Sequence, residues 1–349
     1  MKKVIVTGHN GFIGPHMVRL LKESGYYVKG IDTNYFDDSC KFSDYIKPDE
    51  ELIRDIREIK RSDLEGVYAV CHLAGLSNDP MGDLNKSLTY DINHKASVRL
   101  AKLSKQVGIE KYIFMASCSM YGIADGDIAL DESAAFAPET AYAESKVNTE
   151  KDVKPMGDEN FSVTFMRNAT AYGLSPKLRL DLVVNNLVGW AVTTGEIKIM
   201  SDGSPWRPLV HAEDIARATV AVVEAPKEQV NGKSFNVGQN SENFQIKDIA
   251  NMVGEVIPGC KVVITGEHGS DSRSYKVDFS KIEKELPGFK PKWKLKKAIE
   301  NIYNGYKEFG MNYENFNGKK FIRLKQLDYL SRKGLVDANL FWKNKWTLK

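Results

Sequence analysis

The chain has 349 residues, of which 42% are hydrophobic and 27% are charged, an ordinary composition for a soluble globular protein. Its 49 basic and 46 acidic residues leave a net charge of +3, which gives no reason to expect nucleic acid or an anionic membrane as a partner. No signal peptide follows Met1, and no apolar run approaches the ~20 residues that cross a bilayer, so we expect a cytoplasmic protein. The four cysteines show no spacing typical of a metal site.

The first half of the chain alternates short apolar runs with longer amphipathic segments. Strands are predicted at 4–6, 27–32, 52–56, 68–73, 112–116 and 162–166, and helices at 12–24, about 84–107, and from 142 to before Pro155. This alternation predicts an α/β fold with a doubly wound parallel sheet covered by helices on both faces.

Beyond Arg167 the pattern changes to loops rich in Pro, Gly and Asn, with helices predicted at about 181–194 and 213–224. We expect a smaller α/β lobe that closes over the first domain. The predicted division is 1–168 for a cofactor domain to which part of 209–240 returns, 169–311 mainly for a substrate lobe, and 312–349 for a helical extension. In that extension Leu324, Leu327 and Leu330 have helical spacing, which predicts a helix packed on the body of the protein or on a second subunit.

A glycine-rich turn follows the first predicted strand and opens the first predicted helix. Gly8 permits the tight turn, Gly11 lets the backbone approach a pyrophosphate, and Gly14 lets helix and strand pack closely. Asp32 ends the second strand, where its carboxylate can accept hydrogen bonds from the adenosine ribose. That carboxylate would repel a 2′-phosphate and no arginine adjoins it, so NAD is favoured over NADP.

Tyr142 and Lys146 lie one helical turn apart and share a face of the helix. There the ammonium can lower the pKa of the phenol from roughly 10 towards working pH. Such a phenol could take a proton from an alcohol, and next to a nucleotide site this indicates redox chemistry at a carbinol. A half-buried pair on an amphipathic helix is the alternative interpretation.

With these motifs the chain resembles, from Lys2 to about Ile302, the extended short-chain dehydrogenase/reductases that act on nucleotide sugars, the NAD-dependent epimerase/dehydratase family. The resemblance implies a Rossmann-type cofactor domain, with cofactor contacts from Gly8, Asn10, Gly11, Phe12, Ile13, Gly14, Asp32, Asp55, Ile56, Leu73, Ala74, Gly75, Tyr142, Lys146 and Asn168. Its catalytic residues would be Tyr142, Lys146 and Ser117, the last in Ala116-Ser-Cys-Ser-Met-Tyr-Gly. The substrate would be held by Ser117, Ser119, Thr170, Asn186, Arg207 and Arg273, and no metal is expected.

Two positions depart from the family pattern. The family's 4,6-dehydratases carry an Asp-Glu pair where Cys118 and Ser119 stand here, so ordinary 4,6-dehydration is disfavoured. Arg167-Asn-Ala-Thr170 stands where sugar epimerases commonly have Arg-Tyr-Phe-Asn. The identity of the substrate sugar therefore cannot be inferred from any one epimerase.

The resemblance implies a nucleotide-sugar epimerase that acts at carbon 4 on a nucleotide-diphosphate sugar. A dehydrogenase or keto-reductase, or an atypical dehydratase of the same family, would share the site. A regulator that senses NAD without catalysis is an alternative of a different class, which the intact Ser117, Tyr142 and Lys146 disfavour. A homodimer is expected through the long helices that begin near Leu84 and Tyr142.

Overall fold

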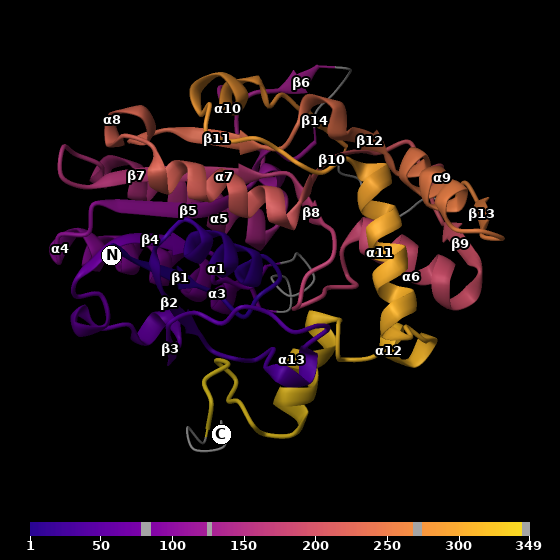
Figure 1. Cartoon of the computed structure of the whole chain (residues 1–349), viewed down its shortest axis with the longest axis horizontal. Coiled ribbons are helices and arrows are strands. Elements are labelled where there is room, and N and C mark those ends of the chain that lie inside the picture. Colours follow the sequence, from indigo (N-terminus) through magenta and orange to yellow (C-terminus); the bar gives the residue numbers. More distant parts are fainter. Residues whose placement is uncertain (78–84, 124–127, 268–273, 344–349) are drawn as a thin grey trace.

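A seven-stranded parallel sheet forms the centre of the protein. A computed structural model describes residues 1–77, 85–123, 128–267 and 274–343. The strand order of the sheet is β11-β7-β5-β4-β1-β2-β3, and every neighbouring pair of strands is parallel. The strands are β1 (Lys3–Thr7), β2 (Tyr27–Asp32), β3 (Glu50–Ile53), β4 (Val67–His72), β5 (Lys111–Ser117), β7 (Ser162–Asn168) and β11 (Ser234–Val237). The expected doubly wound sheet is confirmed, and it lies at the left of Figure 1.

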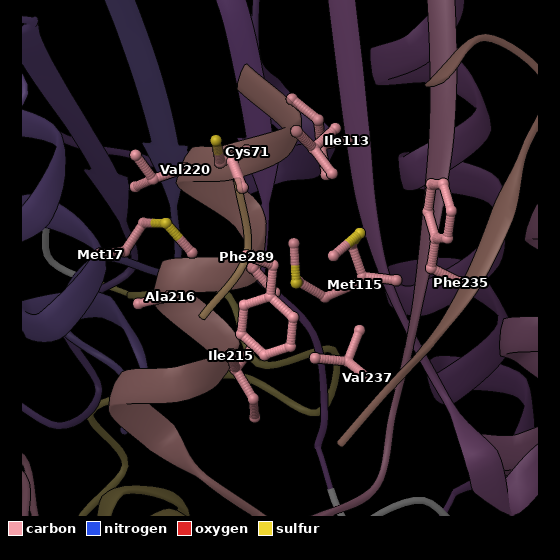
Figure 2. Packing of buried hydrophobic residues seen from close by; sticks show 14 of the residues in the cluster. Met17, Cys71, Ile113, Met115, Ile215, Ala216, Val220, Phe235, Val237 and Phe289 are labelled. Atoms are coloured by element: carbon pink, nitrogen blue, oxygen red, sulfur yellow. The ribbon is translucent and has the colours of Figure 1, made fainter. Parts of the chain in front are cut away.

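Side chains alternate along the strands, so each face of the sheet has its own hydrophobic core. On β1, Val4 and Val6 belong to one core and Ile5 to the other. The covering helices are α1 (Gly14–Glu23), α7 (Ala212–Glu224) and α10 (Ser280–Glu285) in the first core, and α4 (Ala96–Gln106), α5 (Ala141–Val153) and α13 (Arg323–Arg332) in the second. Figure 2 shows the first core, where Ile215, Ala216 and Val220 of α7 lie among Met17, Cys71, Ile113, Met115, Phe235, Val237 and Phe289.

The predicted helix at 84–107 is one helical run with a π-helical interruption. Its described part consists of α3 (Lys86–Thr89), a six-residue π-helical stretch (Tyr90–Lys95) and α4, while Leu84 lies outside the described residues. Asn93, in the π-helical stretch, accepts a hydrogen bond from the backbone N–H of Leu76 and donates one to its carbonyl. The interruption therefore fixes the loop that follows β4, consistent with the frequent occurrence of such bulges at functional sites.

The predicted strand at 52–56 is shifted. The structure pairs Glu50–Ile53 with β2, and Ile56 instead begins a short 3₁₀ helix. Asp55 caps that helix by accepting a hydrogen bond from the backbone N–H of Arg57. Asp is a strong N-cap residue, and this local bond ended the strand earlier than apolar patterning predicted.

The second half builds a smaller α/β lobe, at the right of Figure 1. Two short sheets of the lobe have the orders β12-β10-β8 and β13-β9, with strands β8 (Thr170–Tyr172), β9 (Glu196–Ile199), β10 (Trp206–His211), β12 (Asn243–Gln245) and β13 (Lys261–Ile264). The helices around the lobe's core are α6 (Val183–Thr194), α9 (Ile246–Val256), α11 (Leu295–Phe309) and α12 (Tyr313–Asn317). A third short sheet pairs β14 (Lys276–Val277) with β6 (Ala129–Leu130) and packs in the first core of the large sheet, near α10 in Figure 1. The short helix α8 (Lys227–Val230) lies against β7. The predicted helices at 181–194 and 213–224 correspond to α6 and α7, whereas α9 and α11 were not predicted. Within 209–240, β11 joins the large sheet, and the domain boundaries themselves stay a prediction.

The last described residues return to the first half of the chain. Leu327 and Leu330 of α13 are buried in the core that also contains α4 and α5. Beyond the helix, the indole N–H of Trp342 donates to the carbonyl of Thr33 at 2.7 Å, and the hydroxyl of Tyr35 donates to the carbonyl of Leu340. The sequence predicted that this helix packs either on the body of the protein or on a second subunit. The structure shows α13 packed on the body of the protein. In the described part of the chain, no helix is long and apolar enough to cross a membrane.

A buried ion pair joins α5 to β7. The guanidinium of Arg167 donates to the Glu150 carboxylate through Nε at 3.1 Å and NH2 at 2.5 Å. Ser234 on β11 donates a further hydrogen bond to Glu150, and Arg167 donates another to the hydroxyl of Tyr121. Water has almost no access to this pair, so its members depend on each other to offset their lost hydration.

We therefore expect Glu150→Ala to lower the free energy of unfolding by about 3–5 kcal/mol, because it leaves the Arg167 charge buried without a partner. Asp152→Ala, on the same helix but with an exposed carboxylate paired to His94, is the matched control and should cost at most about 1 kcal/mol. Urea unfolding measures both. Equal costs for the two substitutions would contradict a structural role for the buried pair.

Candidate functional site

A cavity of about 520 Å³ opens at the carboxyl edge of the large sheet. Ligands of open α/β sheets bind at this edge, beside the point where the strand order reverses, here between β1 and β4. The predicted site residues that line it are Gly8, Gly11, Phe12, Ile13, Asp32, Asp55, Ile56, Leu73, Ala74, Gly75, Ser117, Ser119, Tyr142, Lys146, Asn168, Thr170 and Arg207. Asn10, Gly14 and Asn186 are not among the lining residues, and Arg273 lies outside the described residues.

The glycine turn leaves no space for side chains. Gly8 has φ +75, and a Cβ there would lie 2.9 Å from the backbone nitrogen of Ala74. A Cβ on Gly14 would lie 2.1 Å from the carbonyl oxygen of His9, so glycine is needed where α1 begins against the turn. The turn thus exposes backbone at the floor of the cavity, beside a helix N-terminus, which is the arrangement that holds a dinucleotide pyrophosphate. The residues present fit the predicted cofactor.

Two carboxylates, those of Asp32 and Asp55, line the end of the cavity next to β2. The Asp32 carboxylate accepts hydrogen bonds from the backbone N–H groups of Asn10, at 3.1 Å, and Asn34, at 2.8 Å. Asn10 therefore acts behind Asp32 by orienting the carboxylate. Asp55 is held by the guanidinium of Arg57 in a two-point ion pair. Asp32 is thus fixed where the sequence predicts acceptance of the ribose hydroxyls.

Tyr142, Lys146 and Ser117 line one wall of the cavity. Lys146 is only 5% exposed, and its ammonium donates to the carbonyl of Met115 at 2.8 Å. The same nitrogen lies 5.6 Å from the centre of the Tyr142 ring. Ser117 ends β5, and its hydroxyl accepts a hydrogen bond from the hydroxyl of Ser119 at 2.9 Å. A phenol, an amine and two hydroxyls therefore meet where β5 and α5 adjoin.

The cavity is also lined by Asn168, the last residue of β7, by Thr170, the first residue of β8, and by Arg207, the second residue of β10. Asn168 is the β-ladder partner of Ser117. The Asn168 amide donates to the carbonyl of Ala116 at 3.3 Å, and its buried oxygen has no partner among the described residues. Asn186 has a different environment, because its amide donates to the carbonyl of Leu180 at 2.9 Å.

Hydrogen bonds and ring stacking around His211 and Asp214 stabilise the strand that carries Arg207. His211 ends that strand, accepts a hydrogen bond from the backbone N–H of Glu213, and stacks on the Trp293 ring at 4.3 Å. Burial lowers the pKa of His211 to about 3, so its imidazole is neutral. Asp214 accepts hydrogen bonds from the backbone N–H groups of Lys292 and Trp293. These contacts are structural supports for the strand that carries Arg207.

The two positions that depart from the dehydratase pattern have different environments. Cys118 is fully buried outside the cavity lining, and its thiol contacts the carbonyl of Arg167 at 3.1 Å. Burial raises the pKa of Cys118 well above its usual range, so the thiol stays protonated. Ser119 lines the cavity but is no general base.

Sequence reasoning missed four charged residues of the lining: Arg54, Arg179, Asp181 and Arg323. Arg54 forms an ion pair with Asp63. Arg179 and Asp181 form a two-point ion pair, with bonds of 3.0 and 2.8 Å. Their spacing in Lys177-Leu-Arg-Leu-Asp, with polar residues at every second position, was the available signal. Arg323 is the first residue of α13, the leucine-rich helix of the C-terminal segment, for which only the packing of the leucines was predicted.

Burial also determines how Lys146 contributes to stability. It lowers the pKa of this ammonium from 10.5 to about 7. Between these pH values the unfolded chain binds the proton and the folded chain does not, so the stability contributed by this residue rises with pH.

We expect the unfolding free energy of the wild type to rise, relative to that of Lys146→Met, by about 1.4 kcal/mol per pH unit above pH 7. Urea unfolding at pH 7 and pH 9 without cofactor measures this difference. Lys151→Met, an exposed lysine on the same helix, should give a difference that does not change with pH. A flat difference for Lys146→Met would show that the ammonium is not desolvated.

Comparison with known proteins agrees with the site geometry in indicating an enzyme that binds NAD. The model of the NAD dependent epimerase/dehydratase family matches residues 4–238. The "Uncharacterized UDP-glucose epimerase YtcB" of Bacillus subtilis (strain 168) is 27% identical over 316 residues, 86% of this chain and 96% of that protein. Human dTDP-D-glucose 4,6-dehydratase is 23% identical over 330 residues, 90% of this chain and 92% of that protein. The structure of MoeE5 in complex with UDP-glucuronic acid and NAD is 26% identical, with a TM-score of 0.75 over 88% of this chain and 99% of that one. This chain therefore belongs to the NAD dependent epimerase/dehydratase family and is an enzyme that uses NAD.

Proposed function

We propose that the protein is a nucleotide-sugar epimerase that inverts carbon 4 of a nucleotide-diphosphate sugar. The observation that carries this proposal is the placement of Tyr142, Lys146 and Ser117 in the cavity that the glycine turn also lines. A sensor of NAD would not need this phenol. Similarity to the YtcB protein and to the MoeE5 complex supports a UDP-sugar as the substrate class.

The carboxylates of the cavity favour epimerisation over 4,6-dehydration, which needs a free acid and base near carbons 5 and 6. Among the described lining residues the carboxylates are Asp32, Asp55 and Asp181. Asp32 accepts hydrogen bonds from backbone N–H groups, Asp55 is paired with Arg57, and Asp181 is paired with Arg179. None of them lies where the dehydratase pair would stand, at Cys118 and Ser119.

In this mechanism Tyr142, in its deprotonated form, removes the proton of the sugar hydroxyl, while Ser117 donates a hydrogen bond to the reacting oxygen. Lys146 takes up a proton when the tyrosinate forms beside it, and the resulting ammonium stabilises the tyrosinate electrostatically. NAD, when bound, accepts the hydride of carbon 4 and returns it. The keto-sugar would then turn within the cavity, so that the hydride would be returned to its other face, while Tyr142 would give the proton back to its oxygen. Arg207 binds the diphosphate of the substrate.

We expect a panel of nucleotide sugars incubated with the enzyme alone to give one pair of carbon-4 epimers by NMR, with no net change in NADH absorbance. Epimerisation returns the hydride, so no external oxidant is needed. Formation of NADH in proportion to product would instead indicate a dehydrogenase, and a 4-keto-6-deoxy product would indicate a dehydratase. Either result would overturn the proposal.

We expect Tyr142→Phe to lower kcat by about 10²- to 10⁴-fold, because the positioned proton acceptor is lost. The amount of bound NAD should stay that of the wild type. Tyr313→Phe, an exposed tyrosine of α12 outside the cavity lining, should keep wild-type turnover. Turnover of Tyr142→Phe within threefold of the wild type would remove Tyr142 from the mechanism.

We also propose a homodimer that associates through α4 and α5, in a cytoplasmic enzyme. Light scattering of the purified protein should give twice the 39.2 kDa of one chain. A mass of one chain at micromolar concentration would contradict the dimer and leave the proposed reaction unaffected.

A further inference from the structure

Two arginines from distant parts of the sequence line the cavity and have no role in the mechanism above. Arg179 lies shortly before α6 and is 6% exposed, and Arg323 is the first residue of α13 and is 3% exposed. Buried guanidinium groups require counter-charges or hydrogen-bond acceptors, because burial removes their hydration.

Arg179 has such partners. Its guanidinium forms the two-point ion pair with Asp181 and also donates to the hydroxyl of Ser77 at 3.0 Å. Ser77 belongs to the loop after β4 that Asn93 fixes from the π-helical stretch. The charge of Arg179 is therefore balanced within the chain.

Arg323 has no direct carboxylate partner in the described part of the chain, although Asp181 and Asp32 are close enough to influence its charge. One of its nitrogens donates to the carbonyl of Lys177 at 2.9 Å, and the guanidinium lies 4.1 Å from the centre of the Phe36 ring. The other terminal nitrogen, Nη1, is buried and has no hydrogen-bond partner among the described residues. Burial and the neighbouring Arg179 lower the pKa of Arg323 to about 10, so it is still a cation at neutral pH. A buried cation with an unused donor in a ligand cavity indicates an anionic ligand group.

The position of Arg323 indicates which ligand this is. Its neighbours in the lining include Leu327, from the same helix, and Tyr35 and Phe36, from the loop after β2. Asp32, at the end of that strand, is close enough to influence its charge. Arg323 thus lies toward the cofactor end of the cavity.

The contacts of α13 hold it at this end. Gln326 donates to the carbonyl of Tyr35 at 3.1 Å, and Trp342 donates to that of Thr33. The guanidinium of Arg57, which pairs with Asp55, lies 3.8 Å from the centre of the Phe341 ring. The C-terminal segment (residues 312–343) is therefore attached to the two loops that carry Asp32 and Asp55.

We propose that Arg323 binds a phosphate group of the bound NAD, so that the C-terminal segment is part of the cofactor site. A planar guanidinium suits a phosphate because it can donate two parallel hydrogen bonds to it. The diphosphate of the substrate offers the same chemistry, and the test below separates the two ligands.

The test compares full-length Arg323→Met with Arg332→Met by isothermal titration calorimetry, using NAD and UDP in separate titrations. Arg332 lies on the same helix with its side chain 79% exposed and serves as the matched control. We expect Arg323→Met to weaken NAD binding by about 10- to 100-fold, the loss typical of a charge-assisted hydrogen bond, and UDP binding to stay within twofold. Arg323→Lys, which keeps the charge without the planar fork, should bind NAD with intermediate affinity.

A thermal melt without nucleotide separates binding from structural support. Because Arg323→Met removes a buried unpaired charge, we expect its unfolding midpoint to equal or exceed that of the wild type. Unchanged NAD affinity, weakened UDP binding with normal NAD binding, or a lowered midpoint with both ligands weakened would each overturn the proposal. The affinities require no turnover, so failure here leaves the proposed epimerase reaction standing.

Discussion

The charges buried beneath α5 fix the geometry on which the site depends. Lys146 and Glu150 lie one turn apart on this helix, and both point into the protein, where water cannot hydrate them. The ammonium reaches the carbonyl of Met115 on β5, and the carboxylate reaches the guanidinium of Arg167 on β7. Buried polar groups without partners are costly, so these two contacts stabilise the packing of α5 against β5 and β7. Tyr142, one turn before Lys146, lines the same cavity as Ser117.

The parallel sheet then collects the remaining groups at one edge. Because all its strands point the same way, the residues that follow β1, β2, β4, β5 and β7 meet at their carboxyl ends. Local devices hold the loops there, among them the cap that Asp55 supplies and the π-helical Asn93. The C-terminal segment adds Arg323 from the far end of the sequence. In the proposed epimerase, a cofactor held from several sides would remain bound until the hydride has been returned to the oxidised substrate.

Much of this arrangement was readable from the sequence. The strand at 27–32 matches β2, and the glycine turn, Ser117, Tyr142 and Lys146 line the cavity as their motifs indicated. The strand, the glycine turn and the Tyr142–Lys146 pair are local features that follow from apolar runs, glycine spacing and helical periodicity, whereas Ser117 was assigned from the family resemblance. Arg323 could not be found from local features, because its burial depends on contacts between segments far apart in the chain, whereas the alternating pattern around Arg179 was a signal that could have indicated it. The helix α11 was missed for a related reason, as its apolar stripe of Ile299, Ile302 and Tyr306 packs in a lobe assembled from several separate segments.

The central claim is that one carbon–hydrogen bond is broken and remade in the same molecule within one cavity. Substrate carrying deuterium on carbon 4, converted in ordinary water, tests it most directly. We predict that mass spectrometry and NMR will find the deuterium retained on carbon 4 of the epimer, and that unlabelled substrate in heavy water will gain none. Loss of the label to solvent, or entry of solvent deuterium at carbon 5 or 6, would contradict the account.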